Sequence, residues 1–314
     1  MDSLSHALIG IAVAGLSGQQ PSLDNPVYIA AVLGAQAPDF DLITHLGGSL
    51  AYLKQHRAFS HSVPGLMIWA TLITLGIHFF MPETTLFSMF IWAFAGGLSH
   101  ILIDYFNTHG TAILWPFRTE RKSYHLLNVF DPLLLFNMLG LYAFPLTMPE
   151  LSLATFATIA LYILIRIYLR HRSTLWLKNH FAYCQITRIA VMPSLKRIFF
   201  WDFVLETDNR HFVGQIGAFY PILNIKAIFP KQLKVSNIMA QAQKTPIGNF
   251  FSTFTPFIYV EEQQYLTSLQ VTIYDLRYII DNQFLHRATV IFNDAQLPTT
   301  CYMHSYGQKI EVPC

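Results

Sequence analysis

The sequence predicts an α-helical membrane domain followed by a smaller β-rich domain of the α+β type. Hydrophobic residues make up 53% of the 314 residues and charged residues only 12%, whereas a soluble domain has about 25% charged residues. Long apolar stretches fill residues 1–173, and from residue 174 onward shorter apolar runs alternate with polar residues, as in strands. We therefore predict about four transmembrane helices plus short re-entrant or interfacial helices in residues 1–173, and a cytoplasmic β-rich domain in residues 174–314.

The apolar segments of the first part differ in length. Residues 7–16 follow Asp2 and are too short to cross a bilayer, which needs about 20 residues. We interpret them as a short or half-inserted helix and not as a signal peptide. Residues 30–37 end at Pro38 and are expected to be re-entrant or packed on the spans. The four stretches predicted to cross the membrane are residues 62–80, 84–105, 130–148 and 151–169.

Lysine and arginine lie at one end of each predicted span. The turns around Glu83 and Glu150 contain neither residue type. The opposite ends contain Lys54, Arg57, Arg118, Arg121, Lys122, Arg166, Arg170, Arg172 and Lys178. Because basic loops stay in the cytoplasm, we predict a multi-pass protein of the bacterial inner (plasma) membrane with both termini cytoplasmic.

The second part is rich in β-branched and aromatic residues. The predicted strands are residues 185–192, 198–207, 210–220, 256–262, 268–279, 287–294 and 308–312, and a helix is expected within residues 226–243. Cys184, Cys301 and Cys314 show no close spacing, so we expect reduced thiols. The net charge of +2 gives no indication of a nucleic-acid partner.

Metal-binding residue types gather in short clusters within the first 110 positions: His6, Asp39, Asp41, His56, His61, His100, Asp104 and His109. His56 and His61 precede the first predicted span, and His100 and Asp104 end the second, so the topology places them at one depth. Ionisable groups inside apolar helices are costly and usually functional.

The spacing of His100 and Asp104 adds local geometry. They are four residues apart, so on a helix their side chains share one face. The small residues Gly96 and Gly97 would let another helix approach closely. Imidazole and carboxylate ligands suit zinc, manganese or iron better than magnesium or calcium. We predict one or two divalent ions, with zinc the first choice and manganese or iron the alternatives. The predicted metal ligands are His6, His56, His61, His100 and Asp104.

Four motifs together resemble a known family. They are SHALIG at residues 5–10, PDFD at 38–41, HRAFSHS at 56–62 and GGLSHILIDYFNTHGTAILWPF at 96–117. They resemble the YdjM- and YfhP-like bacterial inner-membrane proteins, a family described as metal-dependent hydrolases. Ala58 and Ser60 replace the Gly and Thr of the usual HRG-x-TH form, while both histidines and Arg57 are kept. The resemblance implies a membrane location and a metal site.

We predict a hydrolase in which a metal-activated water attacks an amphipathic or lipid-like substrate, with a phosphoester as the expected class. Asp39 or Asp41 would act as general base, and Arg57 would neutralise an anionic group. Water is the expected nucleophile because no GxSxG motif is present. The alternatives left open are a metal or proton transporter, a non-enzymatic scaffold with a structural metal, and a bis-histidine haem protein. The expected partners are membrane lipids and the substrate, and no protein partner of the second domain is identified.

Overall fold

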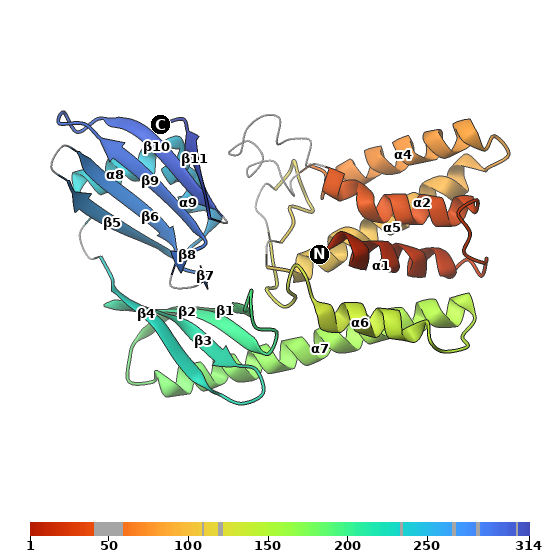
Figure 1. Cartoon of the computed structure of the whole chain (residues 1–314), viewed down its shortest axis with the longest axis horizontal. Helices are drawn as coiled ribbons and strands as arrows, with labels where there is room; N and C mark the ends of the chain where they lie inside the picture. Colours follow the sequence, from red (N-terminus) through yellow and green to blue (C-terminus); the bar gives the residue numbers. More distant parts are fainter. Residues whose placement is uncertain are drawn as a thin grey trace. The chain divides into compact units, whose positions relative to one another are not determined.

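The computed structural model describes residues 1–40, 59–108, 110–118, 122–232, 235–265, 268–280, 283–305 and 307–314. The chain divides into two compact units, Met1–Tyr168 and Leu169–Cys314, which are considered separately (Figure 1). The division falls within α7 (Met148–His180), a continuous helix with residues in both units. The predicted boundary at residue 173 lies within the same helix.

The first unit is helical. Besides the start of α7 it contains α1 (Ser3–Gly15), α2 (Pro26–Gln36), α4 (Val63–Phe80), α5 (Leu86–Phe106) and α6 (Pro132–Leu141). The local sequence explains where four of these helices begin, because a side-chain oxygen just before each accepts a hydrogen bond from a first-turn N–H. The capping residues are Asp2, Asn25, Ser62 and Asp131. Proline in the first turn of α2, α4 and α6 is favourable because its missing N–H is not needed there.

These helices form three hairpins, α1–α2, α4–α5 and α6–α7, whose turns lie at one end of the unit (Figure 1). The three turns contain Asp24 and Glu83, Glu150 follows in the first turn of α7, and none of them contains lysine or arginine. The charge asymmetry noted for two turns therefore extends to the α1–α2 turn.

Three helices in the described part of the chain are long and apolar enough to cross a membrane: α4, α5 and α7. The prediction of a span over residues 130–148 was wrong in its extent. The helix there, α6, has 10 residues, a length of about 15 Å, half the thickness of a hydrocarbon core. It ends before Pro145, which lacks the N–H that a helix interior needs.

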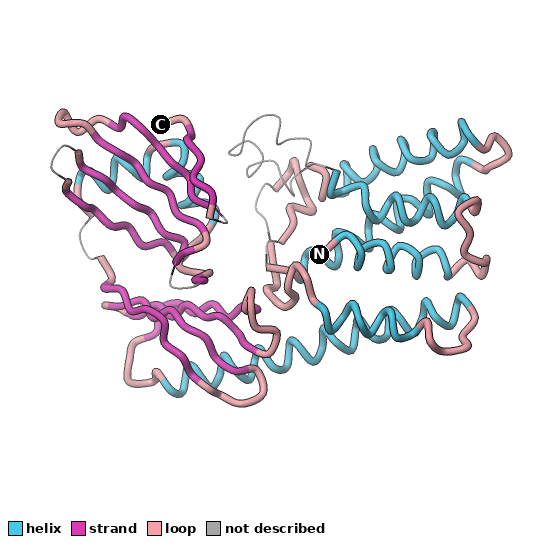
Figure 2. The backbone as a smooth tube through the Cα atoms, viewed as in Figure 1, coloured by secondary structure: helices cyan, strands magenta, loops and turns pink. Residues whose placement is uncertain are grey.

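The second unit contains two antiparallel sheets (Figure 2). The first has the order β1 (Ile186–Pro193), β2 (Phe200–Thr207), β3 (Arg210–Gly217) and β4 (Leu223–Pro230). The second has the order β11 (Gln308–Val312), β10 (Pro298–Ser305), β9 (His286–Phe292), β6 (Leu269–Asp275) and β5 (Ile258–Gln264). A short hairpin, β7 (Ile279–Ile280) with β8 (Gln283–Phe284), and the helices α8 (Asn237–Lys244) and α9 (Pro246–Phe254) complete it. The prediction of a mostly antiparallel β-rich domain is confirmed.

Strand β2 is buried along nearly its whole length. Trp201 and Phe203 pack with Leu177 of α7, whereas Val204 belongs to a cluster with Leu276 near β7. A strand covered on both faces reads as a nearly continuous apolar run, which is what residues 198–207 show.

Three strands, β4, β8 and β10, and one covalent bond were not predicted. β4 occupies the start of the segment expected to be helical, and the helix there begins only after its capping residue Ser236. β10 has few large apolar residues, and its pairing with β9 and β11 defines it. The expectation of three reduced thiols was wrong, because Cys301 and Cys314 form a disulfide while Cys184 is free. Pairing of β10 with β11 sets Cys301 opposite Val312, a proximity that sequence spacing does not show.

Candidate metal centre

Four potential metal ligands converge in the helical unit: Asp39, His61, His100 and Asp104. Asp39 lies in the short turn that follows α2, and His61 lies immediately before the capping residue of α4. His100 and Asp104 lie one turn apart near the end of α5. Three separate stretches therefore contribute to one cluster. A common depth was predicted for His61, His100 and Asp104, and Asp39 joins them.

Close helix packing brings the stretches together. A Cβ atom on Gly96 of α5 would lie 2.0 Å from the carbonyl oxygen of Ala31, and one on Gly34 of α2 would lie 2.0 Å from that of Ala93. Only glycine permits this approach of the two backbones. The prediction that small residues near His100 admit a neighbouring helix is confirmed, and the neighbour is α2.

The distances between the donor atoms suit a tetrahedral ion. The Nε2 atoms of His61 and His100 are 3.2 Å apart. Oδ1 of Asp39 lies 3.6 Å from each of them, and Oδ2 of Asp104 lies 3.6 Å from His61 and 3.7 Å from His100. Zinc bonds of about 2.0–2.2 Å give ligand-to-ligand distances of about 3.3–3.6 Å around a tetrahedron. The four residues therefore fit a divalent ion at their centre.

Hydrogen bonds on the far side of both imidazoles support this arrangement. Nδ1 of His100 donates to the carbonyl oxygen of Ala35 at 2.7 Å, since that oxygen can only accept. In the neutral ring, Nε2 then presents a lone pair toward the cluster. Nδ1 of His61 contacts the hydroxyl of Ser60 at 2.9 Å. Such partners fix the orientation of metal-binding histidines.

The charge balance also favours a cation. His61, His100 and Asp104 are fully buried, and Asp39 is 23% exposed. Two carboxylates so close together repel each other, and buried charges are normally paired or bound to metal. One divalent ion would neutralise both. Asp39 is the member of the cluster that is accessible to solvent.

His6 lies at the edge of this cluster. Its ring stacks on His100 with centroids 3.6 Å apart, and its Nε2 lies 3.4 Å from Oδ1 of Asp104. Both ring nitrogens are buried and make no hydrogen bond with any described residue, an arrangement that an ion would explain. The backbone nitrogen of Met1 contacts the same carboxylate oxygen. Asp104 thus presents one oxygen to His61 and His100 and the other to His6.

The other predicted site residues, Asp41, His56 and Arg57, lie outside the described residues, as does His109. Asp131, just before α6, belongs to a different network. Its carboxylate accepts a hydrogen bond from the Tyr162 hydroxyl, which lies 3.0 and 2.9 Å from the two carboxylate oxygens, and its Oδ1 caps α6.

Sequence reasoning missed the groups that hold the ligands. The side-chain amide nitrogen of Asn107 donates to Oδ1 of Asp104 at 2.8 Å, and the backbone carbonyl oxygen of Asn107 accepts from the Ser123 hydroxyl. The sequence did offer one indication of this contact, because Asn107 follows Asp104 by three residues at the end of a helix. The roles of Ser60 and of the Ala35 carbonyl depend on packing between segments and have no sequence signal.

The membrane-capable helices and the buried cluster of two aspartates and two histidines define an integral membrane protein with a candidate metal centre. The chain belongs to the YdjM inner membrane protein family, whose model matches residues 1–173. The YfhP C-terminal alpha/beta plait domain matches residues 237–310, from α8 into β11. The chain is also 25% identical, over 287 residues, to "Uncharacterized protein YfhP" of Bacillus subtilis (strain 168), covering 88% of this chain and 87% of the relative. No solved structure matches it. The resemblance deduced from the motifs is confirmed, and the protein is an inner-membrane protein.

Proposed function

We propose that this chain is a membrane-bound metal-dependent hydrolase that acts on a lipid-like phosphoester at the cytoplasmic face of the membrane. The observation that supports this most directly is the convergence of Asp39, His61, His100 and Asp104 at distances suited to one divalent ion. Zinc is our first choice, with manganese or iron as alternatives, and one ion is the stoichiometry that the four donors favour, with a second ion beside His6 as the alternative.

A divalent ion at this centre would lower the pKa of a bound water to about 7 and polarise a phosphoryl oxygen. Residues of the chain orient the groups that would hold the ion. His61 and His100 are held by their Nδ1 contacts, so their Nε2 atoms point inward. We assign His61, His100 and Asp104 as the ligands that would hold the ion, and Asp39, the exposed member of the cluster, as the group that would accept the proton of the attacking water. Asp41 remains the alternative base, and Arg57 remains our candidate for binding the substrate's negative charge.

Exposed apolar side chains beside the cluster favour a lipid-like substrate. Phe40, next to Asp39, is 53% exposed, and Phe59, close to His61, is 39% exposed. Phe59 also packs edge-on against Trp115. An amphipathic substrate could place its tail on these side chains and its ester at the metal.

The expected result of a hydrolysis screen is metal-dependent turnover of a phosphodiester or phospholipid by the purified protein in mild detergent. Asp39→Asn should keep the metal on His61, His100 and Asp104 and should lower kcat by about 100-fold or more, the lower range for loss of a general base, because an amide cannot accept the proton. Gln19→Glu, in the α1–α2 turn, is the matched control and should keep full turnover. Metal bound without turnover of any ester class would favour the scaffold alternative, and metal flux into liposomes would favour a transporter.

Two observations bear on the side of the membrane that holds the second unit. Disulfides such as Cys301–Cys314 persist mainly in oxidising compartments, whereas all lysines and arginines of the helical unit avoid its three turns. We base the orientation on the distribution of lysine and arginine, which holds for all three turns of the helical unit, and place the second unit in the cytoplasm. A single disulfide does not require an extracellular location.

Cysteine labelling in intact cells tests this orientation. Cys184 is partly exposed and should react with a membrane-permeant maleimide but not with a charged, impermeant one. A cysteine introduced by Ser22→Cys, in the exposed α1–α2 turn, should react with both. The reverse pattern would place the second unit outside the cytoplasm and would overturn this part of the proposal.

A further inference from the structure

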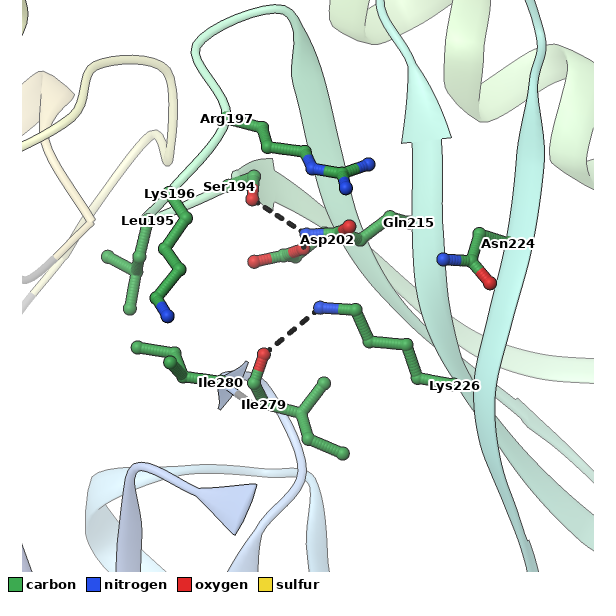
Figure 3. Close-up of a pocket in the computed structure, with 10 residues that line it drawn as sticks. All are labelled: Ser194, Leu195, Lys196, Arg197, Asp202, Gln215, Asn224, Lys226, Ile279 and Ile280. Carbon is green, nitrogen blue, oxygen red and sulfur yellow. Dashed lines mark hydrogen bonds between the residues drawn. The ribbon is translucent and has the colours of Figure 1, made fainter. Parts of the chain in front are cut away.

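A polar pocket lies in the second unit, far along the chain from the metal centre. It has a volume of about 220 Å³ and is lined by residues of the β1–β2 connection, of β2, β3 and β4, and of β7 (Figure 3). Sites for drug-sized ligands occupy about 300–1,000 Å³. This pocket therefore has the size for a smaller molecule.

Positive charge dominates its lining. Of the ten lining residues three are cations, Lys196, Arg197 and Lys226, and one is an acid, Asp202. Figure 3 shows the amino groups of Lys196 and Lys226 directed toward the centre of the pocket from opposite sides. Lys226 is held in place by a hydrogen bond from its amino group to the Ile279 carbonyl oxygen at 3.1 Å. Like charges converging in a partly enclosed space favour a bound anion.

The acid is built into the wall. Asp202 is 4% exposed, and Gln215 Nε2 donates both to its Oδ1 at 2.6 Å and to the Ser194 hydroxyl at 2.8 Å. Burial raises the pKa of Asp202 to about 6, against the opposing effects of the Gln215 hydrogen bond and the Lys226 charge. Buried carboxylates with raised pKa values in clefts are frequent at functional sites.

We propose that this pocket binds a small phosphate-bearing molecule. Its phosphate would lie between Lys196, Arg197 and Lys226, and Asp202 would accept a hydrogen bond from a hydroxyl of the same ligand. Two lysines and an arginine supply the charge-assisted donors that phosphate oxygens prefer. The apolar wall of Ile279 and Ile280 fits the carbon part of such a ligand. This site is separate from the proposed hydrolase and does not depend on it.

Calorimetric titration of the full-length protein in phosphatidylcholine nanodiscs with inorganic phosphate tests this proposal. We expect saturable binding that Lys196→Met and Lys226→Met each weaken about tenfold or more, the range for loss of a charged hydrogen bond. Lys244→Met removes one exposed charge from α8, outside the pocket, and should leave the affinity unchanged. Phosphate bound at the metal centre would not respond to Lys196→Met, so the two sites are distinguishable.

A second set of nanodiscs, which contain phosphatidic acid, tests whether the pocket binds a soluble phosphate or a lipid headgroup. Unchanged phosphate affinity there assigns the pocket to soluble phosphates. If phosphatidic acid weakens the binding of inorganic phosphate to the wild type but not to Lys196→Met, the pocket binds the lipid headgroup. Both results support the proposal, whereas absence of saturable phosphate binding, or equal binding by the two lysine variants and the wild type, overturns it.

The pH dependence gives an independent readout. Sulfate is the suitable probe because it keeps two negative charges throughout this range. Its affinity should rise severalfold as the pH falls through about 6, because Asp202 becomes neutral. The other polar and charged groups of the pocket lining are Ser194, Lys196, Arg197, Gln215, Asn224 and Lys226. Asp202→Asn should bind more tightly at neutral pH and lose this pH dependence, and a flat wild-type profile would contradict the role of Asp202.

Discussion

Replacement of His100 and Asp104 by alanine is expected to remove the bound divalent metal completely. Wild-type protein should contain about one or two ions per chain, since four donors surround one position and His6 adjoins it. The variant keeps one aspartate and one histidine of the four, too few for a stable site. Elemental analysis of protein purified in mild detergent measures the effect.

Two further variants make this result interpretable. His78→Ala removes a histidine near the far end of α4, where its Nδ1 contacts the carbonyl oxygen of Thr84 at 3.2 Å, and should keep the metal. Asp104→Asn keeps the shape of the side chain and should still lose it, which separates loss of a ligand from loss of the fold. Ser60→Ala should weaken the affinity by about 10- to 100-fold, as expected for a residue that orients a ligand. Full metal content in the His100→Ala/Asp104→Ala protein would show that these residues do not bind the metal.

A single methyl group on Gly96 is expected to destabilise the helical unit strongly. Its Cβ would lie 2.0 Å from the backbone oxygen of Ala31, so α2 would have to move away from α5. Because a backbone cannot yield as a flexible side chain does, we expect Gly96→Ala to destabilise the unit by about 3 kcal/mol or more. The displacement would also separate Asp39 from His100 and weaken metal binding.

Gly76 is the matched control, because a Cβ atom at this position in α4 meets nothing within 4 Å. Gly76→Ala should therefore show only the helix preference for alanine, a stabilisation of up to about 1 kcal/mol. Thermal unfolding in detergent and metal content should be measured for both variants. Equal melting temperatures for Gly96→Ala and Gly76→Ala would show that the close approach of α2 and α5 is not required.

Much of the fold follows from local sequence. The helices α4, α5 and α7 are long apolar runs, and the capping residues and first-turn prolines mark where helices begin. The strand segments with β-branched and aromatic residues were predicted, including β2 and β3. The predicted span over residues 130–148 was too long, because length and hydropathy do not reveal that the helix ends before Pro145. β10 escaped prediction because its neighbours in the sheet, more than its own residues, determine its conformation.

The candidate site shows the same division. The i, i+4 spacing on α5 and the position of His61 before the first span predicted three of the four donors as ligands, whereas Asp39 was predicted as a general base. The orientation of each ring did not follow, because it depends on the Ala35 carbonyl and the Ser60 hydroxyl. Asn107 beside Asp104 and the contact of His6 with His100 likewise arise only when separate segments meet.

The sequence by itself determined that this is a membrane protein with a β-rich second domain, and which imidazoles and carboxylates are candidates for metal binding. These properties depend on hydrophobicity, periodicity and spacing, which are local. Only the tertiary structure decided that ligand atoms of four candidate residues lie within 4.8 Å of one another, that Cys301 pairs with Cys314, and that three cations line one pocket with a buried Asp202. The physical reason is that such contacts form between segments distant in the chain, and backbone packing as close as that at Gly96 sets their geometry.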